Sequence, residues 1–424
     1  MMFEAVLGSV VPDPDRLSAD IAELATFVES GQPGWTRRVF SDAYRASREW
    51  TRSRMEAAGL ETRRDSAGNV IGVLAGRDRQ APPLMTGSHT DTVHGGGRFD
   101  GIVGVLSSIE AVRSLREADI VLERDLVVVD FLGEEANEFG ISCMGSRAIA
   151  GQLAVEHLQR TDSHGQTLGD AMSEFGLDPS RAVDEAWASD YLHGYVELHI
   201  EQGPILERSG STIGVVTAIA GIERLLASFT GRADHAGTMP MEARHDALVA
   251  AASAVLTIER EACGAPIHGV STTGRIESYP GAFNIVPDQA KIWAEMRSID
   301  PKWLHGARKR VADKIGEEAA NRGVTSVVEW LSDQDPVRAS TEVQDHISAA
   351  ADLLGLSWEA IPSGAGHDAA HLAHLAPMGM IFIPSIDGRS HVPEEMTTAE
   401  DIAAGAHVLT ATLLSMDRSP RAAR

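Results

Sequence analysis

The short segment Leu126–Phe131 (LVVVDF) constrains the fold more than any other part of the sequence, because its residues are apolar almost throughout. Runs of this kind are typical of strands that are covered on both faces, as in parallel sheets flanked by helices. Further strands are predicted over 69–74 and 83–87, and a helix over 104–115. This order predicts an α/β domain with a mixed, mostly parallel central sheet flanked by helices, in which ligands bind just beyond the strand ends.

The stretch after residue 211 has a different pattern. Helices and strands alternate there in the order of an α+β domain. Strands are predicted over 212–219, 225–231, 269–277 and 289–298, and helices over 246–259 and 303–321. The natural packing of this order is a four-stranded antiparallel sheet with both helices on one face.

The length of 424 residues exceeds what a single hydrophobic core usually supports, which favours two domains. After residue 333 the pattern returns to helix, strand and loop, with a strand over 380–384. We therefore predict a discontinuous, metal-binding catalytic domain formed by residues 1–213 and 334–424. The α+β domain is inserted at 214–333.

The composition of the chain excludes some classes of binding partner and indicates a cellular compartment. Acidic residues number 61 against 37 basic ones, so the formal charge is −24 and the surface would repel nucleic acid and anionic membranes. The only two cysteines, Cys143 and Cys263, are too few for a disulfide framework, which fits a reducing compartment. Because no apolar stretch is long enough to span a membrane, and the first residues do not resemble a signal peptide, we expect a cytoplasmic protein that binds neither nucleic acid nor membrane.

A histidine and an aspartate follow the predicted strand 83–87, in the sequence GSHTDTV. His89 could ligate a metal ion, and Asp91 could hold the other imidazole N–H and so fix the tautomer that offers its lone pair. A histidine in a loop is more often a surface or hydrogen-bonding residue. The pair therefore indicates a metal site only together with further donors.

Two carboxylate motifs stand at comparable positions. Asp100 lies in the glycine-rich turn GGGRFDG, where its carboxylate could bridge two cations or simply cap the following helix. Glu134 and Glu135 come directly after the apolar strand, where adjacent buried carboxylates repel each other unless a metal ion or a proton compensates them. One of them could ligate while the other takes a proton from water. A solvated acidic loop is the simpler alternative.

Two more histidines complete the set of donors. His199 lies in an alternating, strand-like run, and Gln202 beside it could hydrogen-bond a substrate amide or carboxylate. His391 lies in the loop after the predicted strand 380–384. Five nitrogen and oxygen donors thus come from separate strand-end loops. This set of ligands is what a hydrolytic site for two zinc, manganese or cobalt ions requires.

These motifs together match a known family. The sequence resembles the dinuclear-metal amidohydrolases of the aminoacylase and carboxypeptidase-like clan, and within it the branch of N-carbamoyl-L-amino-acid hydrolases, allantoate amidohydrolases and β-ureidopropionases. The resemblance spans nearly the whole chain. It rests on segments that occur in family order, namely GSHTDTVHGGGRFDG, GEEANEFG, HIEQGPILE, GRADHAGTMPMEARHDA, NIVP, SGAGHDA and SHVPEE.

The resemblance implies a role for each donor. Two divalent metal ions per subunit, zinc, manganese or cobalt, would be bound by His89, Asp100, Glu135, His199 and His391. Asp100 would bridge the two ions. Glu134 would be the general base, and Asp91 would support catalysis by holding an imidazole ligand.

The resemblance also implies that the inserted domain is a lid and the dimerisation unit of a homodimer. His235 would stabilise the developing oxyanion, while Asn284, Arg297 and Gln202 would hold the substrate carboxylate. From the sequence alone, Arg297 would be read as an exposed strand residue. The segment 363–369 (SGAGHDA) opens a predicted helix whose free N–H groups could receive an anionic group, or it forms a close-packed turn.

We therefore predict a hydrolase that cleaves the C–N bond of a small carboxylate-bearing ureido substrate, such as an N-carbamoyl-L-amino acid or allantoate. One alternative is an N-acyl amino acid amidase or dipeptidase. Another, of a different class, is a catalytically silent carboxylate-binding protein. The presence of Glu134 beside all five donors argues against this last function, because binding alone does not need a general base.

Overall fold

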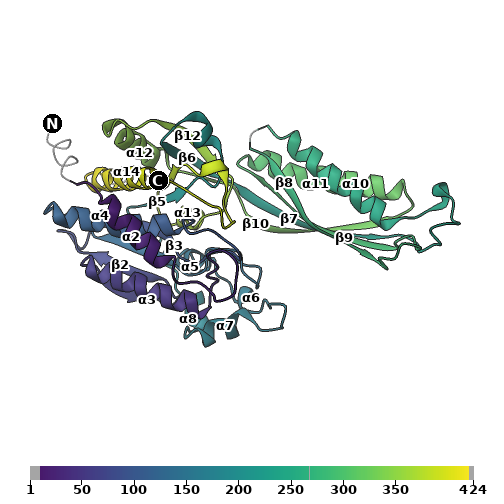
Figure 1. Ribbon diagram of the computed structural model, residues 1–424, viewed down its shortest axis with the longest axis horizontal. Helices are drawn as coiled ribbons and strands as arrows, with labels where there is room; N and C mark the ends of the chain where they lie inside the picture. The colour runs from purple at the N-terminus through teal and green to yellow at the C-terminus, as the bar shows by residue number, and fades with distance from the viewer. Residues whose placement is uncertain (1–9, 267, 420–424) are drawn as a thin grey trace. The chain divides into compact units, whose positions relative to one another are not determined.

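The structure is a computed structural model that describes residues 10–266 and 268–419 (Figure 1). Over these residues the chain forms two compact units. Unit 1 comprises the chain up to Thr217, Ala339–Ile361 and the chain from His367 onward, and unit 2 comprises Ala218–Arg338 and Pro362–Gly366. The limits predicted from the sequence were 213/214 and 333/334.

The larger sheet has nine strands. They are β1 (Glu61–Arg64), β2 (Val70–Leu74), β3 (Leu84–His89), β4 (Leu126–Phe131), β5 (Gly194–Ile200), β6 (Ile213–Ile219), β11 (Val337–Arg338), β12 (Trp358–Ser363) and β13 (Met378–Ile383). Their order is β1-β2-β4-β3-β5-β13-β6-β11, with β12 paired to β6. The central strands β4, β3, β5 and β13 are parallel, whereas β2 and β6 pair with them antiparallel. The predicted α/β class with a mixed, centrally parallel sheet is confirmed.

Helices of unit 1 pack into hydrophobic cores with the larger sheet and with one another. The longer ones are α2 (Pro14–Leu24), α3 (Asp42–Ala57), α4 (Ile102–Glu117), α12 (Thr341–Leu353) and α14 (Ala399–Asp417). The main core joins α4 and α14 to the sheet, with Ile109, Leu409 and Val196 fully buried. A second core gathers the short helices α5 (Met144–Ile149), α6 (Val155–Leu158), α7 (Leu168–Glu174) and α8 (Pro179–Val183). Over the described residues, no helix has the length and apolar character needed to span a membrane.

The parallel strands bring four loops to one edge of the sheet. Because β4, β3, β5 and β13 are neighbours and run in the same direction, the chain leaves each of them at the same edge. Gly87 allows β3 to lie close to β4: its φ is +148°, and a Cβ there would fall 2.0 Å from the carbonyl oxygen of Val129. Side chains that follow these strands are therefore held near one another.

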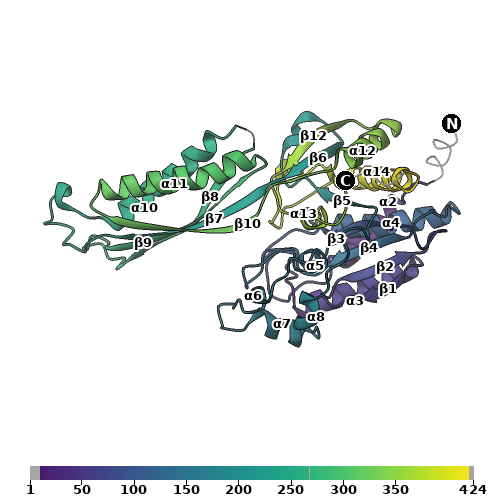
Figure 2. The same cartoon turned by 180° about the vertical axis from the view of Figure 1, so that it is seen from behind.

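Unit 2 is an antiparallel sheet covered by two helices. Its strands are β7 (Gly221–Thr230), β8 (Val270–Tyr279), β9 (Gln289–Ser298) and β10 (Thr325–Gln334), in the order β10-β7-β9-β8. The helices α10 (Ala247–Cys263) and α11 (Pro301–Ala320) pack on one face, as Figure 2 shows. Phe229, Ile292 and Leu304 are buried between the layers. The predicted four-stranded antiparallel sheet with two helices is confirmed.

The membership of this smaller sheet differs from the prediction. The strand predicted over 212–219 is β6, which pairs with β13 in the larger sheet. The fourth strand is instead β10, where no strand was predicted. Only Ala220 separates β6 from β7, which is shorter than a hairpin turn, so the two strands cannot fold back on each other. The chain passes from one sheet into the other at this point.

Candidate active site

The five predicted metal-binding residues converge at the carboxyl edge of the parallel strands in unit 1. His89 ends β3, His199 lies near the end of β5, and Glu135 follows β4. Asp100 stands just before α4, and His391 lies in the loop after β13. All are buried except His391, whose side chain is 50% exposed. The fold thus gathers residues that are far apart in the sequence.

Two groups of donors share Asp100. In the first, Asp100 Oδ1 lies 3.7 Å from His89 Nε2 and 3.1 Å from His199 Nε2. In the second, Asp100 Oδ2 lies 3.1 Å from His391 Nε2, which is 3.5 Å from Glu135 Oε1. Within each group the ligand atoms lie within 4.8 Å of one another. The two oxygens of Asp100 therefore face different donor groups.

The spacing and chemistry of these donors fit divalent cations. Four ligands at tetrahedral positions about a zinc ion lie about 3.4 Å apart, given bonds of about 2.0–2.2 Å. The donor separations of 3.1 to 3.7 Å span that value. Imidazole nitrogens and carboxylate oxygens are ligands that zinc, manganese and cobalt accept. The residues present therefore fit the metal ions expected from the sequence.

The carboxylates of the site are buried, so their ionised forms need a cation nearby. Burial raises the pKa of the Glu134 carboxyl well above its usual range, and raises that of Glu135 to about 7. Burial acts on Asp100 in the same direction, but hydrogen bonds from His199 and His391 outweigh it and hold the pKa of Asp100 well below its usual range. Carboxylates removed from water are stable as anions only when a cation compensates them.

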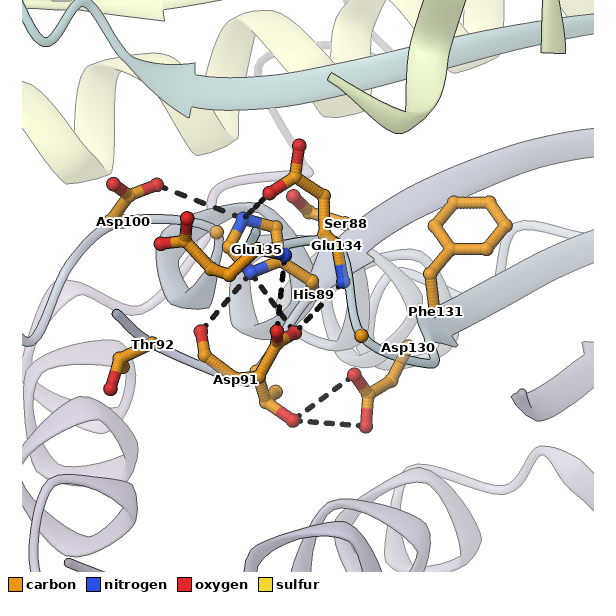
Figure 3. Close-up of polar contacts among 12 residues, drawn as sticks. Ser88, His89, Asp91, Thr92, Asp100, Asp130, Phe131, Glu134 and Glu135 are labelled. Atoms are coloured by element: carbon orange, nitrogen blue, oxygen red, sulfur yellow. Dashed lines mark hydrogen bonds and ion pairs between the residues drawn. The ribbon is translucent and has the colours of Figure 1, made fainter. Parts of the chain in front are cut away.

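The side chain of Asp91 contacts residues of two strand-end loops (Figure 3). Its Oδ1 lies 3.5 Å from His89 Nδ1, which is also 3.2 Å from the Asp91 carbonyl oxygen. The same carboxylate accepts the backbone N–H groups of Glu134 and Glu135, at 3.2 and 3.1 Å. Asp91 therefore orients the His89 ring, with Nε2 toward Asp100, and at the same time holds the backbone of the glutamate pair.

A backbone clamp holds the same glutamates from the other side. The N–H groups of residues 143–145 donate in turn to the carbonyl oxygens of 134, 133 and 132, at 2.8, 3.0 and 2.8 Å. Gly145 makes this approach possible, because a Cβ there would fall 1.9 Å from an asparagine oxygen. Cys143 Sγ lies 3.5 Å from Glu134 Oε1. This clamp was not predicted from the sequence, where its only signal is the pair of small residues Gly145 and Ser146.

Glu395 is a second residue whose role the sequence analysis missed, although it lies within the quoted motif SHVPEE. Its Oε1 accepts the backbone N–H groups of Phe99 and Asp100, at 2.9 and 3.1 Å. Its Oε2 accepts the Ser390 hydroxyl at 2.7 Å, and that hydroxyl is also 3.1 Å from Asp100 Oδ2. Glu395 is 3% exposed. It thus ties the loop of Asp100 to the loop of His391, and so couples the two donor groups.

We expect the Glu395→Gln variant to bind metal roughly 10- to 100-fold more weakly, because partners behind the ligands typically contribute that much to metal affinity. An amide can accept through only one oxygen, so either the two N–H groups or the hydroxyl would face an NH₂ group. Metal content after dialysis against graded chelator measures the effect. Glu394→Gln is the matched control, since the Glu394 side chain is 60% exposed and pairs with Arg389. Equal metal retention in both variants would contradict this role.

Gln202 also lies within the donor cluster. Its Nε2 donates to Asp100 Oδ2 at 2.7 Å and lies 3.3 Å from Ser390 Oγ and 3.4 Å from His391 Nε2. Its backbone adopts a positive φ of +59°, which is uncommon for a residue other than glycine. The side chain predicted to hold substrate therefore points at the Asp100 carboxylate.

The other three predicted residues lie in unit 2. His235 and Asn284 are neighbours, because His235 forms a β-bridge with Ile285 and the Ala236 N–H donates to the Asn284 carbonyl oxygen at 3.0 Å. His235 is exposed, and its Nδ1 accepts a backbone N–H at 3.0 Å. Arg297 lies on β9, where its Nε donates to Glu295 Oε1 at 2.7 Å. The Glu295 carboxylate thus orients the Arg297 guanidinium.

The helix expected from the segment 363–369 is α13 (Asp368–Leu372), a short one. One of its first N–H groups, that of Ala369, donates to the buried carboxylate of Glu197 at 3.2 Å. Glu197 also accepts the hydroxyls of Ser88 and Tyr195. The anionic group received at this helix start is therefore a side chain of the protein itself.

Comparisons with known proteins agree over most of the chain. The profile of Peptidase family M20/M25/M40 matches residues 82–415. An N-carbamoyl-L-amino-acid amidohydrolase of Paenarthrobacter aurescens is 37% identical over 405 residues, which cover 95% of this chain and 98% of that protein. The allantoate amidohydrolase of Bacillus subtilis is 32% identical over 394 residues, covering 93% and 95%. A crystal structure of an amidase of the hydantoinase/carbamoylase family from Burkholderia multivorans is 35% identical and superposes with a TM-score of 0.88, covering 97% of this chain and 100% of that one.

Proposed function

Because the chain belongs to Peptidase family M20/M25/M40, whose enzymes are metal-dependent hydrolases, we propose that it hydrolyses the C–N bond of an N-carbamoyl-L-amino acid or of allantoate. The observation that carries this proposal is the pair of donor groups that share Asp100, with the Glu134 carboxylate beside them. The substrate is a small ureido compound that bears a carboxylate.

Two divalent cations per subunit are assigned to the two donor groups, which are His89, Asp100 and His199, and Asp100, Glu135 and His391. Zinc, manganese and cobalt suit these donors. When bound, such cations supply polarisation of the scissile carbonyl and lower the pKa of a water molecule. The chain contributes the fixed positions of the five side chains, which Asp91 and Glu395 support from behind.

Glu134 is assigned as the general base because it belongs to neither donor group. Its Oε2 lies 3.6 Å from His89 Nε2, so it stands beside the ligands without completing their set. Burial raises the pKa of Glu134, and a carboxylate with a raised pKa takes a proton more readily than an ordinary one. Glu134 removes a proton from the attacking water and returns it to the leaving nitrogen. An N-carbamoyl amino acid then yields the free amino acid, ammonia and carbon dioxide.

Residues of the inserted domain, together with Gln202 of unit 1, are assigned to the substrate. His235 donates a hydrogen bond to the developing oxyanion, and Arg297, Asn284 and Gln202 hold the carboxylate. Glu295 accepts from Arg297 Nε at 2.7 Å and the Gly364 carbonyl oxygen accepts from Nη1 at 3.2 Å, and a guanidinium oriented in this way can still donate to an anion through its other N–H groups. We further propose that the inserted domain acts as a lid and joins two subunits into a homodimer.

Cytoplasmic localisation is supported by the two free cysteines, Cys143 and Cys263.

The test of this function is ammonia release from a panel of small substrates. The panel holds N-carbamoyl-L-amino acids, allantoate, N-carbamoyl-β-alanine and N-acetyl-L-amino acids, and the protein is first reconstituted with zinc, manganese or cobalt. We expect turnover of at least one ureido compound, and its loss on addition of chelator. Release of free amine from N-acetyl compounds alone would move the enzyme to the N-acyl amidases. Binding of carboxylates without any turnover would make it a silent binding protein.

A further inference from the structure

A cavity of about 520 Å³ adjoins the donor cluster inside unit 1. Its walls come from three strand-end or loop segments, residues 38–41, 91–94 and 135–139, together with the turn at Asp162. Asp91 and Glu135 line the cavity, and Glu135 also belongs to one of the donor groups, so the cavity reaches one side of the donor cluster. A volume of this size is typical of a small-molecule site.

Part of the lining of this cavity is apolar, and we call this part its floor. It includes Val39, Phe40 and Phe139. The Phe40 ring makes edge contacts with the rings of Phe139 and Phe175, with centroids 6.2 and 5.4 Å apart. Phe40 also has a φ of +69°, a backbone conformation that a bulky residue rarely adopts unless its surroundings require it. This floor is suited to the hydrocarbon part of a side chain.

The rim of the cavity is negatively charged. The carboxylates of Glu29, Glu138 and Asp162 line it together with a single guanidinium, that of Arg38. Glu29 receives Arg38 Nη2 at 2.8 Å and Nε at 3.2 Å, and Glu138 receives Nη1 at 2.7 Å. Each of the three guanidinium nitrogens therefore already has a carboxylate partner. Arg38 is thus already paired with carboxylates of the rim, and three carboxylates against one guanidinium leave the rim with a net negative charge.

Asp162 is the carboxylate of the rim that is best able to accept a hydrogen bond from a ligand. Its Oδ1 accepts the backbone N–H groups of His164 and Gln166, both at 2.9 Å. Among the described residues, no hydrogen bond to its Oδ2 is found, so this oxygen can accept from a ligand. Glu138 likewise uses Oε1 for Arg38 and is 55% exposed. Both side chains line the cavity and are at least partly exposed, so each can contact a ligand that occupies it.

Resting on the proposed hydrolysis of N-carbamoyl amino acids, we propose that this cavity receives the substrate side chain and selects N-carbamoyl-L-amino acids with a long, positively charged side chain, such as that of lysine. The methylene groups of such a side chain pack on Phe40 and Phe139, and its ammonium group reaches Glu138 and Asp162. Small substrates without a side chain would leave the cavity unfilled.

The test compares kcat/KM for Nα-carbamoyl-L-lysine, N-carbamoyl-L-norleucine and N-carbamoyl-L-glutamate. Norleucine has the same carbon chain as lysine without the charge. We expect lysine to exceed norleucine roughly 5- to 30-fold, as two partly exposed ion pairs would provide. Glutamate should be the poorest of the three. A wild-type enzyme that prefers norleucine or glutamate would overturn the proposal.

The Glu138→Gln/Asp162→Asn double variant tests the assignment to this cavity. We expect the lysine-to-norleucine ratio to fall to about one, since the variant removes both ion pairs. The Glu156→Gln/Glu174→Gln double variant is the matched control, because both residues are exposed, do not line the cavity and change the net charge equally. An unchanged ratio in the first variant would overturn the proposal. No ammonia from any ureido substrate would instead contradict the proposed function.

Discussion

The Glu134→Gln variant is expected to lose about 10²- to 10⁴-fold in kcat, the range that a positioned general base contributes. Glutamine keeps the size and shape of the side chain but cannot take a proton from water. Because Glu134 stands outside both donor groups, metal content should stay at the wild-type level. Glu134 is also buried among other carboxyl groups, so removing its charge should not lower the thermal stability.

Steady-state kinetics on the best ureido substrate, with metal analysis and a thermal melt of the same sample, check this expectation. Glu117→Gln is the matched control, since Glu117 lies on α4 with its side chain 59% exposed, paired with Arg16. A Glu134→Gln enzyme with wild-type kcat would remove Glu134 from the chemistry. A variant that loses metal together with activity would make Glu134 a ligand instead of the base.

The Arg48→Met variant is expected to lose about 3–5 kcal/mol of unfolding free energy, the usual effect of removing one partner of a buried ion pair. Arg48 is 4% exposed and lies 3.2 Å from Asp130 Oδ2, in the interior of unit 1. Its Nη1 donates to the Phe131 carbonyl oxygen at 3.0 Å, and its Nη2 to the carbonyl oxygens of Asp130, at 3.2 Å, and Gly68. Methionine fills the space but removes these hydrogen bonds and the positive charge beside the buried Asp130 carboxylate.

This loss is measured by denaturant unfolding at equilibrium. The matched control is Arg52→Met, one turn further along α3. Arg52 is 42% exposed and pairs on the surface with Glu49 and Glu56, so its loss should change the unfolding free energy by less than about 1 kcal/mol. Equal stability of the two variants would contradict the role of Arg48.

The effect of Arg48 should also reach the active site. Asp130, its partner, accepts the Thr90 hydroxyl with both carboxylate oxygens at 3.1 Å. Thr90 lies between His89 and Asp91, and Phe131 is the last residue of the strand that leads to the glutamate pair. The ion pair in the core and the loops that carry the metal-binding residues therefore form one connected structure.

The pattern of apolar and polar residues was sufficient to predict the strands whose composition matches their burial in the fold. The observed limits of β4 and β9 equal the predicted ones, Leu126–Phe131 and Gln289–Ser298. β4 is buried on both faces, and β9 alternates buried residues with exposed or half-exposed ones, so in each case the local pattern and the tertiary environment coincide. By contrast, β10 carries the exposed apolar residues Val327 and Leu331, which blur that alternation.

The residues of the candidate site were also predicted only in part from local patterns in the sequence. The sequence by itself determined the donor types and their places after strands, because a metal ion requires imidazole and carboxylate groups and a parallel sheet brings the ends of its strands to one edge. The family resemblance supplied His235, Asn284 and Arg297, for which no local pattern exists.

Only the tertiary structure decided which groups meet. That Glu395 ties Asp100 to the loop of His391, that residues 143–145 clamp the glutamate pair, and that β6 pairs with β13 are contacts between segments far apart in the chain. A hydrogen bond of this kind depends on two positions in space, and neither residue alone carries a signal of the other. The sequence thus determined the chemistry available to this protein, and the packing of distant segments decided the geometry in which that chemistry is held.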